Sequence, residues 1–145
     1  MEWLDDNAAH FLTTAGGQRK RVLELGAATG LLSIFLVRRG HVVVTSDCET
    51  DGEDVERNIA HNFGLNGLPA PPHLPHDWGA PLPAGAAGGF DLVIANDILI
   101  YTKAYPALIT TLLALLALRP GALCRACPRA SAVPVGFARI DQRGE

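Results

Sequence analysis

The ten residues 21–30, RVLELGAATG, constrain the fold of this chain more than any other stretch. Three apolar residues are bounded by charge before them and by glycine after them, which is typical of a central parallel strand covered on both faces. These residues are Val22, Leu23 and Leu25. Gly26 and Gly30 then allow the backbone to turn sharply and to come close to a ligand. Because open α/β sheets bind ligands beside such turns, at the carboxyl ends of their strands, we expect a ligand site here.

The spacing of the glycines distinguishes two kinds of cofactor site. A dinucleotide fingerprint, G-x-G-x-x-G, would require glycine at position 28 and glycine or alanine at position 31. The chain has Ala28 and Leu31 at these positions, so the interpretation as an NAD-dependent enzyme fails twice. The pattern present is Glu24-x-Gly26-x-x-x-Gly30. A βα turn that binds no ligand stays open as an alternative.

The composition indicates one globular α/β domain. With 145 residues, 48% of them hydrophobic and 19% charged, the chain is long enough for a single core and is not disordered over most of its length. The net charge of −3 gives no general attraction to nucleic acid. The acidic start, MEWLDD, is unlike a signal peptide, and the longest apolar run, 107–118, is shorter than the roughly 20 residues of a membrane span. We expect a cytoplasmic or nuclear protein without membrane or nucleic-acid contacts.

The cysteines do not indicate a metal site. Cys48, Cys124 and Cys127 suit a reducing compartment. Cys124 and Cys127 have C-x-x-C spacing, and His73 and His76 are the histidines that would complete a zinc site with them. The chain has no second C-x-x-C pair, and both pairs lie among prolines or arginines. We therefore expect no bound metal.

Hydrophobic periodicity divides the chain into alternating helices and strands. Helices are predicted over 3–13 and 31–39, from a capping box at 50–53 to Gly64, and from Pro106 to Arg119. Strands are predicted over 21–25, 41–46 and 90–95, with a very short one within 73–78 and a fifth from residue 122. This alternation predicts a Rossmann-like, open and mostly parallel sheet with helices on both faces, whose last strands are missing or irregular.

Polar and aromatic residues follow the predicted strands at the edge of the glycine turn. Asp47 ends the second strand about 20 positions after the first glycine, where an acidic residue can accept hydrogen bonds from a ribose. Asp77 and Trp78 follow the third strand, and Asn96 and Asp97 follow the fourth. The alternatives without a ligand are helix caps for Asp47 and Asp97 and a rim aromatic for Trp78.

Five segments between about residues 21 and 120 together resemble the family 16 methyltransferases. They are VLELGAATG at 22–30, TSD at 45–47, NIAHN at 58–62, DWG at 77–79 and FDLVIAND at 90–97. This group of class I S-adenosylmethionine (SAM) enzymes contains many protein-lysine methyltransferases, and it usually has glycine where this chain has Ala28. The resemblance implies SAM binding by Glu24, Gly26, Ala27, Ala28, Thr29, Gly30, Asp47, Cys48, Asp77, Trp78 and Asn96.

The resemblance also implies the chemistry. The family usually follows its fourth strand with D-x-x-Y, whereas this chain has DILIY from Asp97 to Tyr101, with one extra residue. Asp97 would accept a hydrogen bond from the incoming amine, and Tyr101 would attract the cation through its ring. The signature [DN]-P-P-[YFW] of adenine, cytosine and glutamine methyltransferases is absent. We expect a protein substrate methylated at a side-chain amine, best guessed as lysine. A SAM-fold scaffold without catalysis stays an alternative.

The end of the chain is expected to leave this fold incomplete. We divide the chain into a SAM-binding core, 1–123, and an irregular tail, 124–145. Related enzymes continue after the fifth strand with a helix and a β-hairpin, whereas about 20 residues follow Leu123 here. The run CRACPR at 124–129 interrupts the apolar pattern where the fifth strand should be deepest. We expect either a truncated gene model or a sheet edge that a partner or an oligomer covers.

Overall fold

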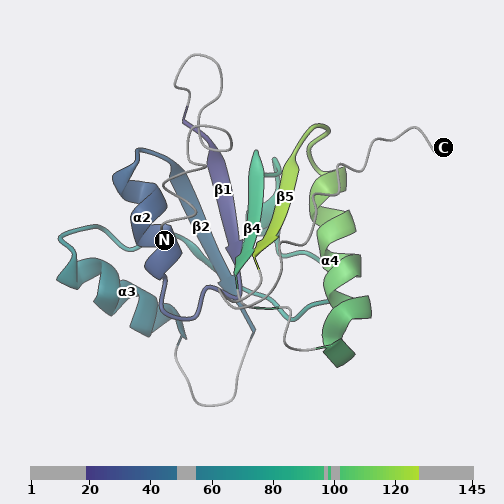
Figure 1. Cartoon of the computed structure of the whole chain (residues 1–145), viewed down its shortest axis with the longest axis horizontal. Coiled ribbons are helices and arrows are strands. Elements are labelled where there is room, and N and C mark those ends of the chain that lie inside the picture. The colour runs from purple at the N-terminus through teal and green to yellow at the C-terminus, as the bar shows by residue number, and fades with distance from the viewer. Residues whose placement is uncertain (1–18, 49–54, 97, 99–101, 128–145) are drawn as a thin grey trace.

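The computed structural model describes residues 19–48, 55–96, 98 and 102–127, to which the statements below refer (Figure 1). The strands are β1 (Arg21–Leu25), β2 (Val42–Asp47), β3 (His73–Pro75), β4 (Leu92–Asn96) and β5 (Leu123–Cys127). The helices are α2 (Leu31–Arg38), α3 (Val55–Leu65) and α4 (Tyr105–Ala117), with short 3-10 turns at Ala84–Ala86 and Thr102–Ala104. The predicted helix at 3–13, the capping box at 50–53 and the tail after residue 127 lie outside the described residues.

The strands form one parallel sheet in the order β3-β2-β1-β4-β5. This order confirms the predicted Rossmann-like α/β fold with its first strand in the centre. The chain adds β2 and β3 on one side of β1 and then returns to place β4 on the other side. Ligands of open α/β sheets bind where the strand order reverses, and here that point is the carboxyl end of β1.

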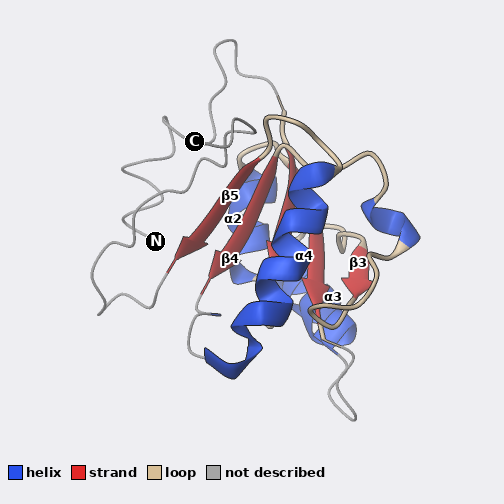
Figure 2. Cartoon of the chain, turned by 90° about the vertical axis from the view of Figure 1, so that its right-hand side faces the viewer, coloured by secondary structure: helices blue, strands red, loops and turns tan. Residues whose placement is uncertain are grey.

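Side chains of the central strands alternate between two apolar layers, because successive strand residues point to opposite faces. On one face Val22, Val43 and Ile94 pack with α2. On the other face Leu23 and Val93 pack in a cluster that includes Leu108 and Leu115 of α4. Figure 2 shows α4 in front of the sheet and α2 behind it. Both faces are therefore covered, as the apolar runs predicted. None of the described helices is both long and apolar enough to cross a membrane.

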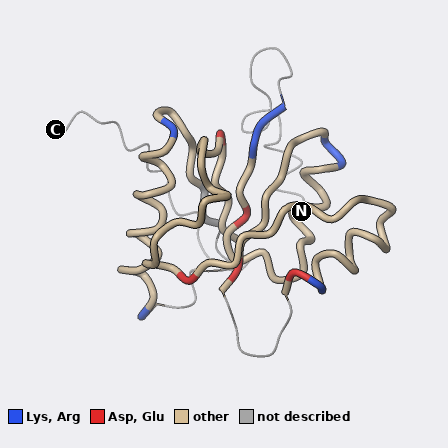
Figure 3. The backbone as a smooth tube through the Cα atoms, turned by 180° about the vertical axis from the view of Figure 1, so that it is seen from behind, with Lys and Arg blue, Asp and Glu red and all other residues tan. Residues whose placement is uncertain are grey.

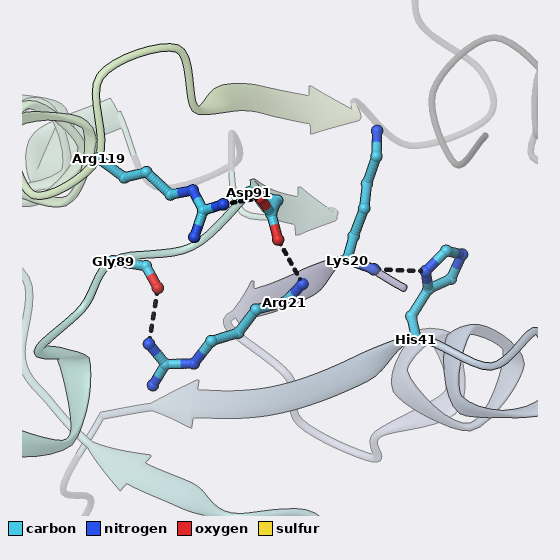
Figure 4. A network of polar contacts seen from close by, with 6 residues as sticks. All are labelled: Lys20, Arg21, His41, Gly89, Asp91 and Arg119. Atoms are coloured by element: carbon cyan, nitrogen blue, oxygen red, sulfur yellow. Dashed lines mark hydrogen bonds and ion pairs between the residues drawn. The ribbon is translucent and has the colours of Figure 1, made fainter. Parts of the chain in front are cut away.

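At the amino end of the sheet, polar contacts join the start of β1 to the loop before β4 (Figure 4). Asp91 accepts a hydrogen bond from the backbone N–H of Arg21 at 2.7 Å and forms an ion pair with Arg119 at 2.6 Å. The Arg21 guanidinium donates to the carbonyl oxygen of Gly89 at 2.6 Å and lies 4.4 Å from the centre of the Phe90 ring. The loop before β4 is thus fixed to the start of β1.

The end of α3 differs from the prediction. Gly64 lies inside α3, which continues to Leu65, so the prediction that Gly64 ends the helix is wrong. Gly67 has a φ of +67°, its N–H donates to the Gly64 carbonyl, and the Leu68 N–H donates to the Phe63 carbonyl, both at 3.0 Å. This is a Schellman motif, in which a residue with left-handed backbone follows the helix. Gly67 is therefore the glycine that caps the C-terminal end of α3, three positions after the glycine that was predicted to do so.

The fifth strand is also more regular than predicted. β5 pairs with β4 over five residues, from Leu123 beside Leu92 to Cys127 beside Asn96. The predicted boundary between residues 123 and 124 therefore falls inside a strand. The run CRACPR at 124–129 was expected to interrupt this strand. A strand at the edge of a sheet forms hydrogen bonds to a neighbour on one side only, and β5 makes these with β4. Among the described strands, β3 and β5 form the two edges of the sheet.

Candidate functional site

The strand register brings four predicted site segments to one level at the carboxyl edge. Leu25 of β1 lies beside Ser46 of β2 and beside Ala95 of β4. The residues that follow, Gly26, Asp47 and Asn96, therefore stand side by side. Asp47 also pairs with Pro75, and its carbonyl accepts the N–H of His76 at 2.8 Å, so the turn after β3 joins the same edge. This confirms the expectation that the strand ends converge.

The glycines of the turn are required by the packing of the chain itself. Gly26 and Gly30 have φ values of +67° and +72°, which disfavour other residues. A Cβ at Gly26 would lie 2.6 Å from Cγ2 of Ile98, and one at Gly30 would lie 3.1 Å from Cγ2 of Ile59. Ala28 is also left-handed, with a φ of +44°. Close packing and left-handed backbone angles thus define the shape of the turn.

Glu24 supports the turn from beneath. Its side chain is buried, and Oε2 accepts hydrogen bonds from the backbone N–H of Ser33, at 3.0 Å, and from the Ser33 hydroxyl. Gly30, the N-cap of α2, offers no side chain, so Glu24 supplies the acceptor that the first turn of the helix needs. Burial raises the pKa of Glu24 to about 7, although the bonds from Ser33 oppose the shift. Sequence reasoning missed Ser33 because the contact depends on how α2 is placed.

Asp47 connects the end of β2 to the tip of the glycine turn. Its Oδ2 accepts the N–H of Ala28 and its Oδ1 accepts the N–H of Cys48, both at 2.8 Å. Oδ1 also accepts the weaker Cys48 thiol at 3.4 Å. An ionised carboxylate has about four lone-pair sites, so one remains for a hydroxyl donor. Cys48 is exposed beside it. The carboxylate therefore keeps a free acceptor site for a ribose hydroxyl.

A second support of the turn comes from α3. The side-chain amide of Asn62 donates to the carbonyl oxygen of Thr29 at 2.9 Å. Thr29 and Ala28 are exposed, whereas Ala27 is buried. Asn62 belongs to the NIAHN segment that carried the family resemblance, but no role was predicted for it. The contact now explains why an asparagine on α3 matters for the edge.

The turn after β3 is anchored on α4. Asp77 is exposed, and Trp78 is half-buried against the cluster of the α4 face. The Gly79 N–H donates to the Thr111 hydroxyl at 2.8 Å, and a Cβ at Gly79 would lie 3.1 Å from that of Ala107. Trp78 thus packs as a rim aromatic while part of its side chain stays accessible. Thr111 is a supporting residue that the sequence did not reveal.

The predicted catalytic residues Asp97 and Tyr101 lie outside the described residues. Their described neighbours are Asn96, exposed at the end of β4, and Ile98, which is buried against the α4-side cluster and Gly26. The side chain of Ile98 thus packs directly against the first glycine of the turn. Asp97 as an amine-facing residue stays a prediction.

Charge is distributed unequally between the two ends of the sheet (Figure 3). Asp47 and Asp77 follow strands at the carboxyl edge. Arg19, Lys20 and Arg21 lie at the start of β1. Burial lowers the pKa of His41, and the positive charges of Lys20, Arg19 and Arg39 lower it further. An acidic edge favours a cationic group over an anionic one.

Comparison with solved structures shows the class of the fold. The magnesium protoporphyrin IX methyltransferase ChlM of Synechocystis PCC 6803, crystallised with SAM, matches with a TM-score of 0.58 and 24% sequence identity. The match covers 79% of this chain and 53% of that enzyme. The sheet and its covering helices therefore have the same fold as that enzyme.

Comparison of sequences shows the family. Protein N-lysine methyltransferase METTL21A of Danio rerio is 36% identical over 64% of this chain and 43% of its own length. EEF1A lysine methyltransferase 3 of Xenopus tropicalis is 31% identical over 64% of this chain and 40% of its length. The chain thus spans about two fifths of the length of these relatives. The sequence model of the family described as lysine methyltransferase matches residues 1–141. The chain therefore belongs to the lysine methyltransferase family, which is SAM-dependent.

Proposed function

We propose that this protein binds SAM at the carboxyl edge of its sheet and transfers the methyl group to a side-chain amine of a protein, with lysine as the acceptor. The observation that carries the proposal is the register that brings Gly26, Asp47 and the turn of Asp77 and Trp78 to one edge, at the point where the strand order reverses. Family membership supports the reaction, and the names of the two relatives support lysine.

The described residues fit such a cofactor. Asp47 accepts hydrogen bonds from the backbone N–H of Ala28 and from the N–H and thiol of Cys48, and it keeps one acceptor site for a ribose hydroxyl. Asp77 offers an exposed carboxylate to an exocyclic amine, and the accessible part of Trp78 offers a surface for a base. Gly26 and Gly30 hold the turn close to these groups. Glu24 and Asn62 support the turn through their hydrogen bonds to Ser33 and Thr29.

The methyl transfer requires little from the protein beyond positioning the amine and the methyl donor. When bound, SAM would supply a sulfonium methyl group. A neutral amine would attack the methyl carbon in line with the C–S bond, which would break as S-adenosylhomocysteine leaves. Asp97 would accept a hydrogen bond from the amine and thereby aim its lone pair, and Tyr101 would face the resulting cation. The carboxylates of the edge favour a cationic product electrostatically. No covalent enzyme intermediate is needed for this transfer.

Calorimetry with S-adenosylhomocysteine, SAM and NAD tests the binding step. We expect the purified chain to bind the first two, and Asp47→Ala to weaken binding by about 1.5–3 kcal/mol, the range for hydrogen bonds to charged groups. Glu56→Ala, which removes an exposed carboxylate on α3, is the matched control and should leave the affinity unchanged. Equal affinities of wild type and Asp47→Ala would refute the ribose site, and preferential binding of NAD would refute the cofactor.

A further inference from the structure

Exposed arginines gather at the amino end of the sheet, opposite the candidate site (Figure 3). Arg19 lies just before β1, Arg38 ends α2, and Arg39 is the C-cap of that helix. All three are exposed. Because Arg21 of β1 pairs with Val42 of β2, the start of β1 and the turn that leads from α2 into β2 lie side by side. The three arginines therefore belong to one surface.

Contacts with the chain hold two of these arginines in place. Nε of Arg19 donates to the Gly40 carbonyl oxygen at 2.9 Å, so this side chain bridges the segment before β1 and the turn after α2. The guanidinium carbon of Arg39 lies 3.6 Å from the centre of the Phe35 ring. Among the described residues, Nη1 and Nη2 of Arg19 make no hydrogen bond. A guanidinium presents its donors in a rigid fork that matches a carboxylate, and Arg19 keeps that fork available.

The described carboxylates lie mostly elsewhere. They are Glu24, Asp47, Glu56, Asp77 and Asp91. Of these five, Asp91 alone lies at the amino end, where it pairs with Arg119 at 2.6 Å and accepts the N–H of Arg21. Within the described part of the chain, the amino end therefore carries an excess of positive charge. Such a surface attracts an anionic partner.

An exposed apolar side chain lies among these cations. Val42 is 44% exposed, and its N–H donates to the carbonyl oxygen of Lys20 at 2.9 Å, which places it beside the segment of Arg19. Protein interfaces are enriched in arginine and contain apolar groups, whereas interfaces with nucleic acid are more polar and much more positive. The net charge of the whole chain is −3. A protein partner therefore fits this surface better than a nucleic acid does.

We propose that Arg19, Arg38, Arg39 and Val42, called the basic surface below, bind an acidic segment of a partner protein. Carboxylates of the segment pair with the arginines, and an apolar side chain of the segment packs on Val42. Where the partner is the methyl acceptor, this second attachment raises the effective concentration of its amine at the opposite end of the sheet. That last step rests on the proposed function, whereas binding of the segment does not.

Fluorescence anisotropy with a labelled peptide of glutamate and leucine tests the binding. We expect the purified chain to bind this peptide, and the affinity to fall as salt is raised, because salt screens exposed charges. The same peptide with glutamine in place of glutamate should not bind. Lack of binding by the acidic peptide, or tighter binding of an oligouridylate RNA, would overturn the proposal.

Paired variants assign the binding to the basic surface. The double variant Arg19→Gln, Arg38→Gln should weaken peptide binding about tenfold, since an exposed ion pair contributes up to roughly fivefold. The double variant Arg19→Lys, Arg38→Lys keeps both charges and should retain most of the affinity. Arg57→Gln removes an exposed arginine from the first turn of α3 and is the matched control, with unchanged affinity. Equal affinities of the glutamine double variant and wild type would contradict the assignment.

Two other occupants are decided by the same variants. Self-association that the glutamine double variant abolishes, without any peptide binding, would assign the surface to a second copy of this chain. Peptide binding that appears only after Glu2→Gln, Asp5→Asn and Asp6→Asn would assign it to the acidic start of the chain. Either result would refute the proposal.

Competition separates this proposal from the proposed function. Unlabelled acidic peptide should lower methyl transfer from SAM to protein in a cell extract and leave the affinity for S-adenosylhomocysteine unchanged, because it binds away from the carboxyl edge. Transfer that the bound peptide does not lower would refute docking of the acceptor. A chain that binds the peptide but transfers no methyl group would refute the proposed function and support the basic surface.

Discussion

At the scale of single residues, contacts between distant parts of the chain shape the candidate site. Glu24 on β1 holds the first turn of α2 through Ser33, and Asn62 on α3 holds the carbonyl of Thr29. Ile98 after β4 fills the space beneath Gly26. These contacts hold the glycine turn beside the end of β2, where Asp47 lies.

The buried carboxyl of Glu24 should make stability depend on pH. The pKa of Glu24 is about 7 in the folded chain and 4.5 in the unfolded one, so between these values the folded state binds more protons. Stability should therefore fall as pH rises from about 4.5 to about 7, by roughly 3 kcal/mol at 1.36 kcal/mol per pKa unit. Urea denaturation at several pH values measures this, and Glu24→Gln should flatten the profile over that window. A variant with the same slope as wild type would contradict the assignment.

Gly26 should tolerate no larger residue while Ile98 is present. In Gly26→Ala the new Cβ would lie 2.6 Å from Cγ2 of Ile98, and overpacking of this kind costs about 1–3 kcal/mol. In an Ile98→Ala background the same substitution should cost less, with a coupling of about 1–2 kcal/mol in a double-mutant cycle of unfolding free energies. The left-handed backbone of Gly26 should leave a residual cost in both backgrounds. Additive effects of the two substitutions would contradict the contact.

At the scale of elements, the sequence predicted what depends on local pattern. Strand β1, helix α2 and the helix that begins near Pro106 follow from apolar runs and their breakers. The convergence of Asp47, Asp77 and Asn96 follows from the rule that parallel strands end at one edge. What the sequence did not predict depends on register and backbone angles. The end of α3 is set by the left-handed Gly67, and β5 is set by its ladder to β4. Ser33, Asn62 and Thr111 act across contacts that only packing reveals.

Two glycines near the end of α3 should respond in opposite ways to alanine. Gly64 is helical and has open space within 4 Å of the position that a Cβ would take, so Gly64→Ala should stabilise the protein by about 0.5–1 kcal/mol. Gly67 has equally open surroundings but a φ of +67°, so Gly67→Ala should destabilise it by about 1 kcal/mol. Thermal unfolding of both variants measures the difference. Stabilisation by both substitutions would contradict the Schellman motif.

At the scale of the whole molecule, apolar surface remains accessible on the α4 side. Ile109 and Leu113 of α4 are 54% and 50% exposed, and Leu118 directly after it is 44% exposed. β5 is an edge of the described sheet. Exposed apolar side chains and strand edges both promote association. We therefore keep the prediction that the chain expressed alone associates, or unfolds below the roughly 45–65 °C usual for mesophilic domains.

Size-exclusion chromatography with light scattering measures this association. We expect a mass above the 15.4 kDa of one chain, falling toward that value when Leu113→Lys places a charge on the exposed side of α4. His61→Lys adds the same charge on the exposed side of α3 and serves as the control. A stable, cooperatively melting monomer would show that the chain does not need a covering partner.

The central claim is that the carboxyl edge of this sheet uses SAM to methylate a protein amine. The most direct measurement is transfer of labelled methyl groups from SAM to a cell extract by wild-type protein and by Asp97→Asn, with the affinity of both for S-adenosylhomocysteine measured in parallel. We expect wild type to label protein at lysine, and Asp97→Asn to lose this labelling while its affinity stays within a few-fold. Labelling of nucleic acid without protein, or undiminished transfer by Asp97→Asn, would contradict it.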